Sequence, residues 1–339
     1  MREPQHLIPA QVREKWSTQT SAVEPIDIRN QTRVVEFLFL GFSEIPPHGH
    51  TWFFFLFLAI YLVTIMGNTT LVTLIQVDRH LHNPMYFFLS HLACIDVSFS
   101  SVTIPKILAN FLYQKHTIAY HQCMAQMFFL MAFAGSECTL LAVMAFDRYA
   151  AICQPLRYGH LMSSQVRVPL AVAAWVWGVL DSAIHTALAT RLSFCGANHL
   201  DHIFCDVPPL LKIACSHTYV NELSLHLASI FMGFGPLLFI LFSYAYILQA
   251  ILRIRSNTGR RKAFSTCAAH LIVVMMFYGM AILNYNRPPS GYSLQIDTLI
   301  SSLYCCISPM LNPLIYSLRN KEVKGALRNF LAGLKKEHI

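Results

Sequence analysis

Charged side chains are scarce in this sequence of 339 residues, and the scarcity excludes whole classes of protein. Lys, Arg, Asp and Glu make up 12% of the residues, whereas a soluble globular domain carries about 25%. The 25 basic and 17 acidic side chains are too few to cover a soluble body of this size. An ordinary soluble enzyme is therefore excluded. A disordered chain is excluded as well, because 55% of the residues are hydrophobic.

Three further sequence signals are missing. Residues 1–50 contain no apolar run of about 7 to 15 residues behind a basic start, so we expect the first apolar span, and not a cleaved signal peptide, to direct membrane insertion. No stretch repeats with a period of about 20 to 50 residues, which argues against a solenoid. The two halves of the chain also lack the mutual resemblance that many transporters show.

What the sequence does contain is seven long apolar spans. A helix needs about 20 mainly apolar residues to cross about 30 Å of hydrocarbon. We therefore predict an all-α membrane protein, a seven-transmembrane helix bundle over residues 51–317. An N-terminal tail over 1–50 precedes the bundle, and a short amphipathic C-terminal helix and tail follow over 318–339. The predicted spans are 52–77, 84–104, 123–150, 168–188, 223–251, 263–283 and 294–316.

The basic residues predict the orientation of the bundle. With the N-terminus outside, the four inner segments hold fifteen basic residues and the outer loops hold five. Basic residues concentrate in cytoplasmic loops, so we expect a multi-pass protein of the plasma membrane with its N-terminus extracellular. The net charge of +8 then marks the cytoplasmic side and not a nucleic-acid surface. The fifteen are Arg79, Arg148, Arg157, Arg167, Arg253, Arg255, Arg260, Arg261, Lys262, Arg319, Lys321, Lys324, Arg328, Lys335 and Lys336.

Cysteines on the predicted outer side indicate disulfides. In an oxidising compartment these four cysteines allow three pairings. The stretch 202–206, His-Ile-Phe-Cys-Asp, could instead be a metal site, with His199 and His217 nearby. We favour a disulfide with surface histidines, because thiolate ligands compete poorly with oxidation outside the cell. The four cysteines are Cys123, Cys195, Cys205 and Cys215.

Two stretches fit the acceptor pattern for N-glycosylation. Asn30-Gln31-Thr32 lies in the predicted outer tail, so Asn30 is the expected site of glycosylation. Asn68-Thr69-Thr70 lies within the first span, where glycosylation is not expected.

Two carboxyl groups fall inside predicted spans, where charges are costly and usually functional. Asp96 lies about 18 Å from the inner start of the second span, and Glu137 about 21 Å from the outer start of the third. They reach similar depths, and two close carboxylates cannot both stay ionised without a cation between them. Either they share a monovalent cation such as sodium, or one is protonated. The alternative is two neutral carboxyls with separate local hydrogen bonds, and no other cofactor is expected.

Motifs at the predicted cytoplasmic ends favour a movable inner side. Asp147-Arg148-Tyr149 closes the third span, either as a helix-end ion pair or as a strong donor beside a cytoplasmic opening. In the seventh span, proline removes a helical hydrogen bond and Asn312 can satisfy a freed carbonyl, so a hinge is expected there. The residues beyond it place apolar and basic side chains on opposite sides, which predicts a helix lying on the inner leaflet.

Taken together, these motifs resemble those of rhodopsin-like G-protein-coupled receptors, and more narrowly of odorant (olfactory) receptors. The resemblance covers nearly the whole chain, and the set is specific although each motif alone is not. Phe146 stands where the family most often has Tyr. The stretches that carry the resemblance are PMYFFLS at 84–90, MAFDRYAAIC at 144–153, SY at 243–244, KAFSTCAAHL at 262–271 and PMLNPLIYSLRN at 309–320.

The resemblance implies a receptor and not an enzyme, and the sequence shows no nucleophile–base arrangement. It implies that Cys123 pairs with Cys205 and Cys195 with Cys215. It also implies coupling to a stimulatory olfactory-type G protein that raises cyclic AMP. The residues that it assigns to activation and coupling are Asp147, Arg148, Tyr149, Tyr244, Asn312, Pro313 and Tyr316.

We expect the ligand site among the outer halves of the third, fifth, sixth and seventh spans. Helical spacing places four residues of the third span on one helix face, and four residues of the sixth span on another. One residue each from the fifth and seventh spans could complete the lining. This lining is apolar, adaptable through methionine and free of charge, so it predicts a small, neutral, mostly apolar volatile ligand. Interhelical packing would explain the same pattern. The residues are Met127, Leu130, Met131, Ala134, Tyr278, Ala281, Ile282, Tyr285, Met232 and Ser302.

Two other functions are weighed beside an odorant receptor. A rhodopsin-like receptor for a non-odorant endogenous ligand would have the same motifs, and a peptide agonist would favour it. A transporter or channel would require substrate flux, and the dissimilar halves of the chain argue against it.

Overall fold

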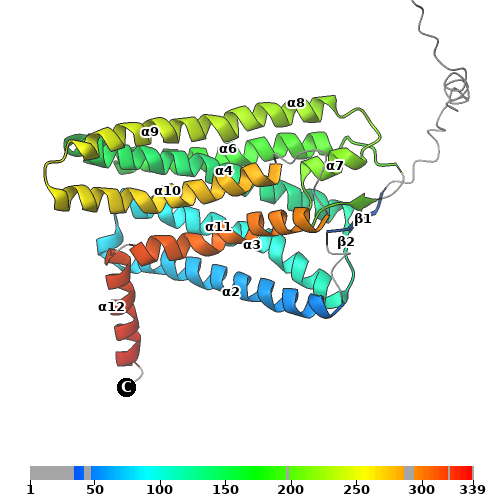
Figure 1. Ribbon diagram of the computed structural model, residues 1–339, viewed down its shortest axis with the longest axis horizontal. Helices are drawn as coiled ribbons and strands as arrows, with labels where there is room; N and C mark the ends of the chain where they lie inside the picture. Colours follow the sequence, from blue (N-terminus) through cyan, green and yellow to red (C-terminus); the bar gives the residue numbers. More distant parts are fainter. Residues whose placement is uncertain (1–33, 42–46, 196–197, 286–293, 320, 338–339) are drawn as a thin grey trace, which may run out of the picture. The chain divides into compact units, whose positions relative to one another are not determined.

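Seven long helical segments run side by side in the described part of the chain (Figure 1). The computed structural model describes residues 34–41, 47–195, 198–285, 294–319 and 321–337. The seven-helix fold is as predicted. The segments are α2 (Pro47–Val77), α3 (Pro84–Tyr113), α4 (Tyr120–Cys153), α6 (Ser164–Ala189), α8 (Tyr219–Ala228) continued through the π-helical turn η4 (Ser229–Phe234) into α9 (Gly235–Leu252), α10 (Asn257–Tyr285) and α11 (Leu294–Arg319).

Lipid is the natural surrounding of these helices. Within the described residues, α2, α3, α4, α6, the α8–α9 segment and α10 are long and apolar enough to cross a membrane. Large apolar side chains on their outward faces, such as Phe55, Trp177 and Phe242, are exposed. A soluble protein rarely exposes contiguous apolar surface of this kind, whereas a bilayer satisfies it.

Shorter elements join the long helices. α12 lies across the direction of the other helices in Figure 1, as a helix on a membrane surface would. It is tied to the bundle by the Tyr86 hydroxyl, which donates a 2.8 Å hydrogen bond to Glu322. The shorter elements are η2 (Arg79–Leu81), η3 (Pro155–Arg157), α5 (Tyr158–Leu161), α7 (Val207–Ile213) and α12 (Lys321–Glu337).

A small sheet, which hydropathy does not predict, caps the opposite end of the bundle. Its order is β2-β1-β3, with β1 (Glu36–Phe39) antiparallel to β2 (Thr117–Ala119) and parallel to β3 (His199–Leu200). The strand from the expected tail is therefore the central strand. We call this end the sheet end, and the other the α12 end.

Local sequence explains where α3 starts and stops. Asn83 caps the helix by accepting a hydrogen bond from the Tyr86 backbone N–H, and Pro84 occupies the first turn, where its missing N–H does no harm. The predicted end at residue 104 is wrong, because the helix continues through Pro105. A proline removes only one helical hydrogen bond, and a helix packed against its neighbours can continue despite that loss. The helix stops at Gln114, whose φ of 50° is left-handed.

α4 is the central helix and packs against α3, α6, α9 and α10. Its approach to α6 is close enough to require glycine. A Cβ on Gly178 would lie 2.4 Å from the backbone oxygen of Ala132 and 2.6 Å from the backbone nitrogen of Ser136. The α4–α6 contact is thus set by backbone against backbone, which fixes the position of the residues on α4.

Candidate functional site

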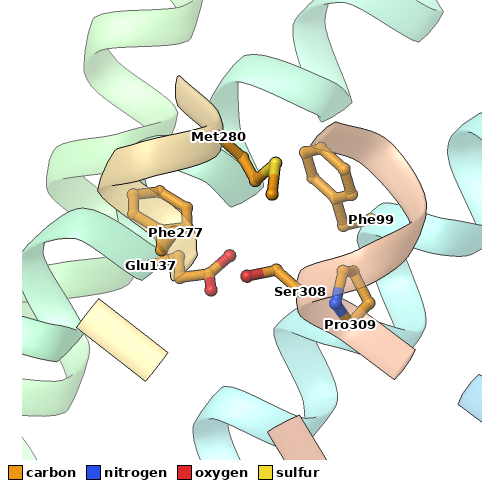
Figure 2. A pocket seen from close by; sticks show the side chains of 6 residues that line it. All are labelled: Phe99, Glu137, Phe277, Met280, Ser308 and Pro309. Carbon is orange, nitrogen blue, oxygen red and sulfur yellow. The ribbon is translucent and has the colours of Figure 1, made fainter. Parts of the chain in front are cut away.

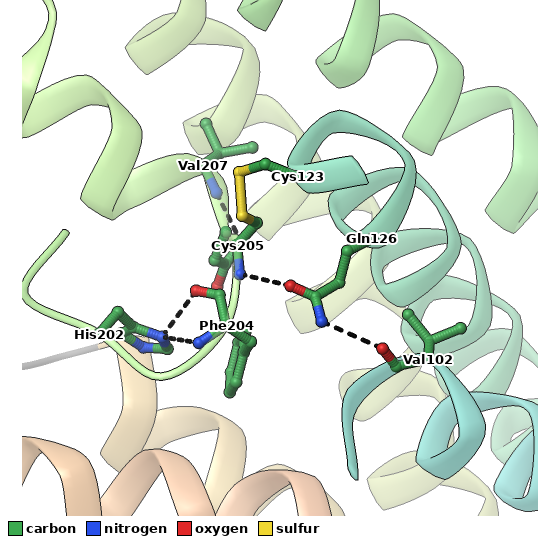
Figure 3. Close-up of a disulfide and its surroundings, with 8 residues drawn as sticks. Val102, Cys123, Gln126, His202, Phe204, Cys205 and Val207 are labelled. Atoms are coloured by element: carbon green, nitrogen blue, oxygen red, sulfur yellow. Dashed lines mark hydrogen bonds between the residues drawn. A yellow bond between two sulfur atoms is a disulfide. The ribbon is translucent and has the colours of Figure 1, made fainter. Parts of the chain in front are cut away.

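The sheet end is built around two disulfides. The structure joins Cys123 to Cys205 (Figure 3) and Cys195 to Cys215, the pairing that the resemblance implies. Beside the first bond, Gln126 on α4 accepts a 2.9 Å hydrogen bond from the Cys205 backbone N–H. The same amide donates to the Val102 carbonyl at 3.0 Å, so one side chain links the loop between α6 and α8 to both α4 and α3.

The metal reading of the stretch 202–206 is not supported. Cys205 is in a disulfide. His202 Nε2 lies 3.0 Å from the Ser301 hydroxyl on α11, and its Nδ1 lies 3.1 Å from the Phe204 carbonyl. Over the residues that the structure describes, no three His, Cys, Asp or Glu side chains gather as a metal site. The histidine therefore holds the loop against α11.

The structure distributes the expected ligand-site residues over three buried clusters. Met127 and Met131 pack in the cluster of the sheet end, with Phe37 and Phe39 of β1. Leu130, Ala134 and Ala281 belong to a second cluster deeper in the bundle, and Tyr278 belongs to a third. Met232 is buried on the π-helical turn and Ser302 is half-buried on α11.

The prediction is wrong for one expected ligand residue, Ile282. The side chain of Ile282 is 47% exposed on the outward face of α10, so it does not line an inner site. Because residues 271–283 of α10 are almost all apolar, helical spacing cannot separate the lipid side of this part from its bundle side. The side chain of Tyr285, and Asn30 as a whole, lie outside the described residues.

A small cavity lies inside the bundle beside the second cluster, with which it shares Phe99 and Met280 (Figure 2). It is lined by Phe99, Glu137, Phe277, Met280, Ser308 and Pro309. Figure 2 shows the Glu137 carboxyl and the Ser308 hydroxyl pointing toward each other across it. Among the described residues, neither Glu137 Oε1 nor Ser308 Oγ has a hydrogen-bond partner. The cavity thus has apolar walls and two unsatisfied polar groups at its base.

Asp96 lies near this cavity, as the depth estimate predicts. Asn312 Nδ2 on α11 donates to both Asp96 carboxylate oxygens at 3.1 Å. Glu137 is close enough to interact electrostatically with Asp96. Asn312 Oδ1 is buried and has no partner within the described residues. Asp96 and Asn312 are thus a buried hydrogen-bonded pair, with Glu137 within electrostatic range of Asp96.

At the α12 end, Arg148 is held by the residue before it. Both Arg148 Nε, at 3.0 Å, and Nη2 donate to Asp147 Oδ2. The Tyr158 hydroxyl of α5 donates to Asp147 Oδ1 at 2.8 Å. Burial, together with the neighbouring Asp147 carboxylate, raises the pKa of Tyr158, so this phenol stays protonated and remains a donor at neutral pH. Tyr149 lies apart from this group, where its hydroxyl accepts from Gln154 at 3.3 Å.

A second polar link crosses three helices at the same end. The Tyr244 hydroxyl lies 2.8 Å from His270 Nδ1, and His270 Nε2 lies 3.1 Å from the Leu141 carbonyl. His270 therefore connects α9, α10 and α4. The Tyr316 hydroxyl is buried and has no hydrogen-bond partner within the described part of the chain. Pro313, next to Asn312, packs toward α2, where a Cβ on Gly67 would meet its ring at 3.1 Å.

Sequence reasoning gives no role to several residues that these sites contain, among them Gln126, Tyr158, Phe204 and His270. A signal existed for Gln126 and His270, because a polar side chain inside an apolar span needs a buried partner. No periodic signal could find Tyr158 and Phe204, which lie in connecting segments.

Comparison with known proteins gives consistent results. A family profile described as olfactory receptor matches residues 57–333. Olfactory receptor 5T17 of Mus musculus is 47% identical over 304 residues, 90% of this chain and 94% of that protein. Olfactory receptor 5AP2 of Homo sapiens is 46% identical over 303 residues, 89% of this chain and 96% of that protein. The crystal structure of squid rhodopsin matches with a TM-score of 0.67 at 18% identity, covering 86% of this chain and 87% of that one, and this likeness shows the fold alone.

Proposed function

This chain belongs to the olfactory receptor family, and from that premise we propose that it binds a small, mostly apolar volatile odorant and activates a stimulatory olfactory-type G protein, raising cyclic AMP. The chain is a multi-pass membrane protein and a signalling receptor rather than an enzyme. The observation that carries the proposal is the family match over residues 57–333, which include both the cavity and Arg148.

The chemistry of the bundle interior supports an apolar ligand. Leu130, Ala134 and Ala281 pack close to Phe99 and Met280, which also line the cavity. Methionine and aromatic walls bind by shape and dispersion, and methionine adapts to irregular molecules. Apart from Glu137, whose charge the proposed sodium ion would balance, these walls carry no charge, so a charged ligand would lose its hydration without a matching partner and neutral molecules are favoured.

The α12 end supplies the groups that could respond to the ligand. A ligand that prefers one arrangement of the helices shifts the population toward it. We infer that the receptor switches when Arg148 leaves Asp147 and the Tyr244–His270–Leu141 link between α9, α10 and α4 rearranges. To change the ratio of active to resting receptor from 1:99 to 99:1, a ligand must bind the active state about 5.5 kcal/mol more favourably than the resting state.

The proposed orientation in the plasma membrane places the sheet end outside. The excess of basic residues at the α12 end favours this, because cytoplasmic segments collect Lys and Arg. The disulfides at the sheet end favour it too, because they persist in an oxidising compartment. In this orientation α12 lies on the inner leaflet lipid, and Asn30 lies on the side where it can be glycosylated.

We also propose that Asp96 and Glu137 hold a sodium ion. The donor set fits a hard cation, because Glu137 Oε1, Ser308 Oγ and Asn312 Oδ1 are buried oxygens that have no partner among the described residues. Asp96 would add a second carboxylate. A bound cation would let both carboxylates stay ionised in the bundle. The competing arrangement has two neutral carboxyls and requires no ion.

The direct test of the function is an odorant screen in cells that carry a cyclic-AMP reporter and the olfactory-type G protein. We expect neutral volatiles to raise cyclic AMP, and acids or amines of the same size to act weakly. Activation by a peptide or another endogenous molecule, with no response to volatiles, would favour the alternative receptor function. An acid or amine agonist far stronger than its neutral analogues would contradict the proposed ligand chemistry.

A further inference from the structure

We propose that His50 and His116 together bind one divalent transition-metal ion, with zinc as the reference ion, at the sheet end of the bundle. His50 lies at the start of α2, and His116 lies between α3 and β2. The ion would join these two segments, which are distant in the sequence. The inference does not rest on the odorant or the G-protein function, because it concerns only the two side chains and their surroundings.

The two imidazole rings lie at a spacing that suits a shared ion. Their centroids are 5.8 Å apart and their planes are nearly perpendicular, at 87°. Zinc binds histidine nitrogen at about 2.0–2.1 Å and prefers a tetrahedral arrangement, so two imidazoles that share it have ring centroids about 5–6 Å apart. The observed spacing therefore fits one ion between the two side chains.

The ring of His50 has polar atoms that its surroundings do not satisfy. Both Nδ1 and Nε2 are buried, and neither has a hydrogen-bond partner among the described residues. The ring packs edge-on against Phe111 of α3, with centroids 5.6 Å apart, and this contact offers no hydrogen bond. Buried polar atoms normally have a partner, and an orphaned one points to a bound water or ion. A metal ion between the two rings would satisfy one of these nitrogens.

His116 is held in place and is in the form that binds metal. It lies directly before β2, and its carbonyl accepts a 2.8 Å hydrogen bond from the Phe39 N–H of β1. Burial, and after it the neighbouring His50, lower the pKa of His116. The ring is therefore neutral at neutral pH, and neutral imidazole is the ligand form of histidine.

The surroundings favour a transition metal over a hard cation. Imidazole nitrogen suits zinc, copper and nickel, whereas magnesium and calcium prefer oxygen ligands. Lys115, next to His116, lies 3.9 Å from the Glu36 carboxylate, which counters its charge beside the proposed ion. Both histidines are half-buried, so an ion reaches them from the solvent at the sheet end, and water completes its coordination.

The test measures zinc-dependent stability and zinc binding of the purified full chain. The affinity tag contains no histidine, and sodium is held constant. Thermal unfolding in detergent is recorded over a zinc titration and over a magnesium titration, and bound zinc is counted by equilibrium dialysis. His50→Phe and His116→Phe each keep an aromatic ring and remove its nitrogens. The matched control is His121→Phe, which changes an exposed histidine near the same end.

We expect zinc, and not magnesium, to raise the melting temperature of the wild type, because an ion that binds the folded state stabilises it. Loss of a group that only orients a metal ligand already weakens binding about 10- to 100-fold. His50→Phe and His116→Phe should each therefore raise the half-maximal zinc concentration at least about tenfold. Each should also bind one zinc ion fewer. The double variant should behave like either single variant, and His121→Phe like the wild type.

A wild type whose melting temperature does not respond to zinc would overturn the proposal without recourse to any variant. A normal zinc response in either His50→Phe or His116→Phe would overturn it too. So would effects that add in the double variant, because the two histidines would then bind ions separately. The readout uses no odorant and no G protein, so failure of the metal site and failure of the receptor function are distinguishable.

Discussion

The Asp147 carboxylate accepts hydrogen bonds from two residues, Arg148 of the same helix and Tyr158 of α5. Arg148 occupies one oxygen and Tyr158 the other, so the arginine is held beside Asp147. The tyrosine lies in α5, outside the long helices, and acts on Arg148 only through Asp147. It is thus a positioning residue whose loss should change the resting state without removing the arginine.

Tyr158→Phe should therefore raise basal cyclic AMP. The ring remains but the bond to Asp147 is lost, and about 1 kcal/mol, a factor of about five in the resting equilibrium, is the expected size. Basal cyclic AMP per receptor at the surface is the measurement. The control is Tyr149→Phe, which removes a hydroxyl that contacts Gln154 and not Asp147. Equal basal activity in Tyr158→Phe and wild type would contradict the assignment.

Glu137 gives a second prediction at the scale of the residue. If the unpartnered Glu137 and Ser308 oxygens hold sodium, the melting temperature of the purified receptor should rise when sodium replaces N-methylglucamine. Glu137→Gln should abolish most of that rise, since it removes one of the two carboxylates. A wild type whose melting temperature ignores sodium would exclude the ion and leave two neutral carboxyls.

The distance between two packed helices depends on the side chains at their contact, and it is shortest where that residue is glycine. Gly178 lets α6 touch the backbone of α4, so Gly178→Ala should overpack the contact and destabilise the fold by about 1–3 kcal/mol. Gly279 on α10 is the control, because a Cβ there meets nothing within 4 Å. Gly279→Ala should be neutral or stabilising, since alanine favours helix. Thermal unfolding in detergent measures both, and equal melting temperatures would contradict the packing argument.

The two disulfides should differ in their effect on stability. Cys123–Cys205 closes 82 residues and Cys195–Cys215 closes 20. By the chain-entropy relation, their losses correspond to about 4.5 and about 3.3 kcal/mol. Cys123→Ser should therefore lower the melting temperature more than Cys195→Ser. The reverse order would show that local packing, and not loop closure, governs this end.

The elements differ in how far the sequence alone predicts them. Apolar runs of about 20 residues predict the long helices, because a bilayer requires that length. They cannot predict the π-helical turn at Ser229–Phe234 or the extension of α3 beyond Pro105, because both depend on packing against neighbours. Strand β1 carries no strong local signal, since its pairing partners lie in two distant loops.

The candidate site shows the same division. Depth counted along two helices predicts that Asp96 and Glu137 lie at similar depths, because the rise per residue is constant, and the two are within electrostatic range. The sequence does not fix the rotation of α10, so the prediction that Ile282 lines the ligand site is wrong. The contacts of His202, Tyr158 and Phe204 depend on loop conformations, for which residue spacing gives no rule.

At the scale of the whole molecule, the two ends of the bundle have separate tasks. The sheet end combines disulfides, β1 and a buried loop above an apolar cavity. The α12 end combines the Arg148–Asp147 pair of α4 with His270, whose bonds join α9, α10 and α4. Both ends contact α4. A ligand that changes how α4 packs against α9 and α10 would therefore alter the α12 end by population shift.

The central claim is that an odorant bound inside the bundle acts through Arg148 on a stimulatory olfactory-type G protein. The most direct measurement is the cyclic-AMP response to an active neutral odorant in wild type, Arg148→Ala and the exposed-site control Arg79→Ala, at equal surface expression. We predict responses in wild type and Arg79→Ala, and loss of at least about nine-tenths of the response in Arg148→Ala, as when more than 1.4 kcal/mol of coupling is removed. A full response in Arg148→Ala, or no cyclic-AMP response of a surface-expressed wild type to any volatile, would contradict the account.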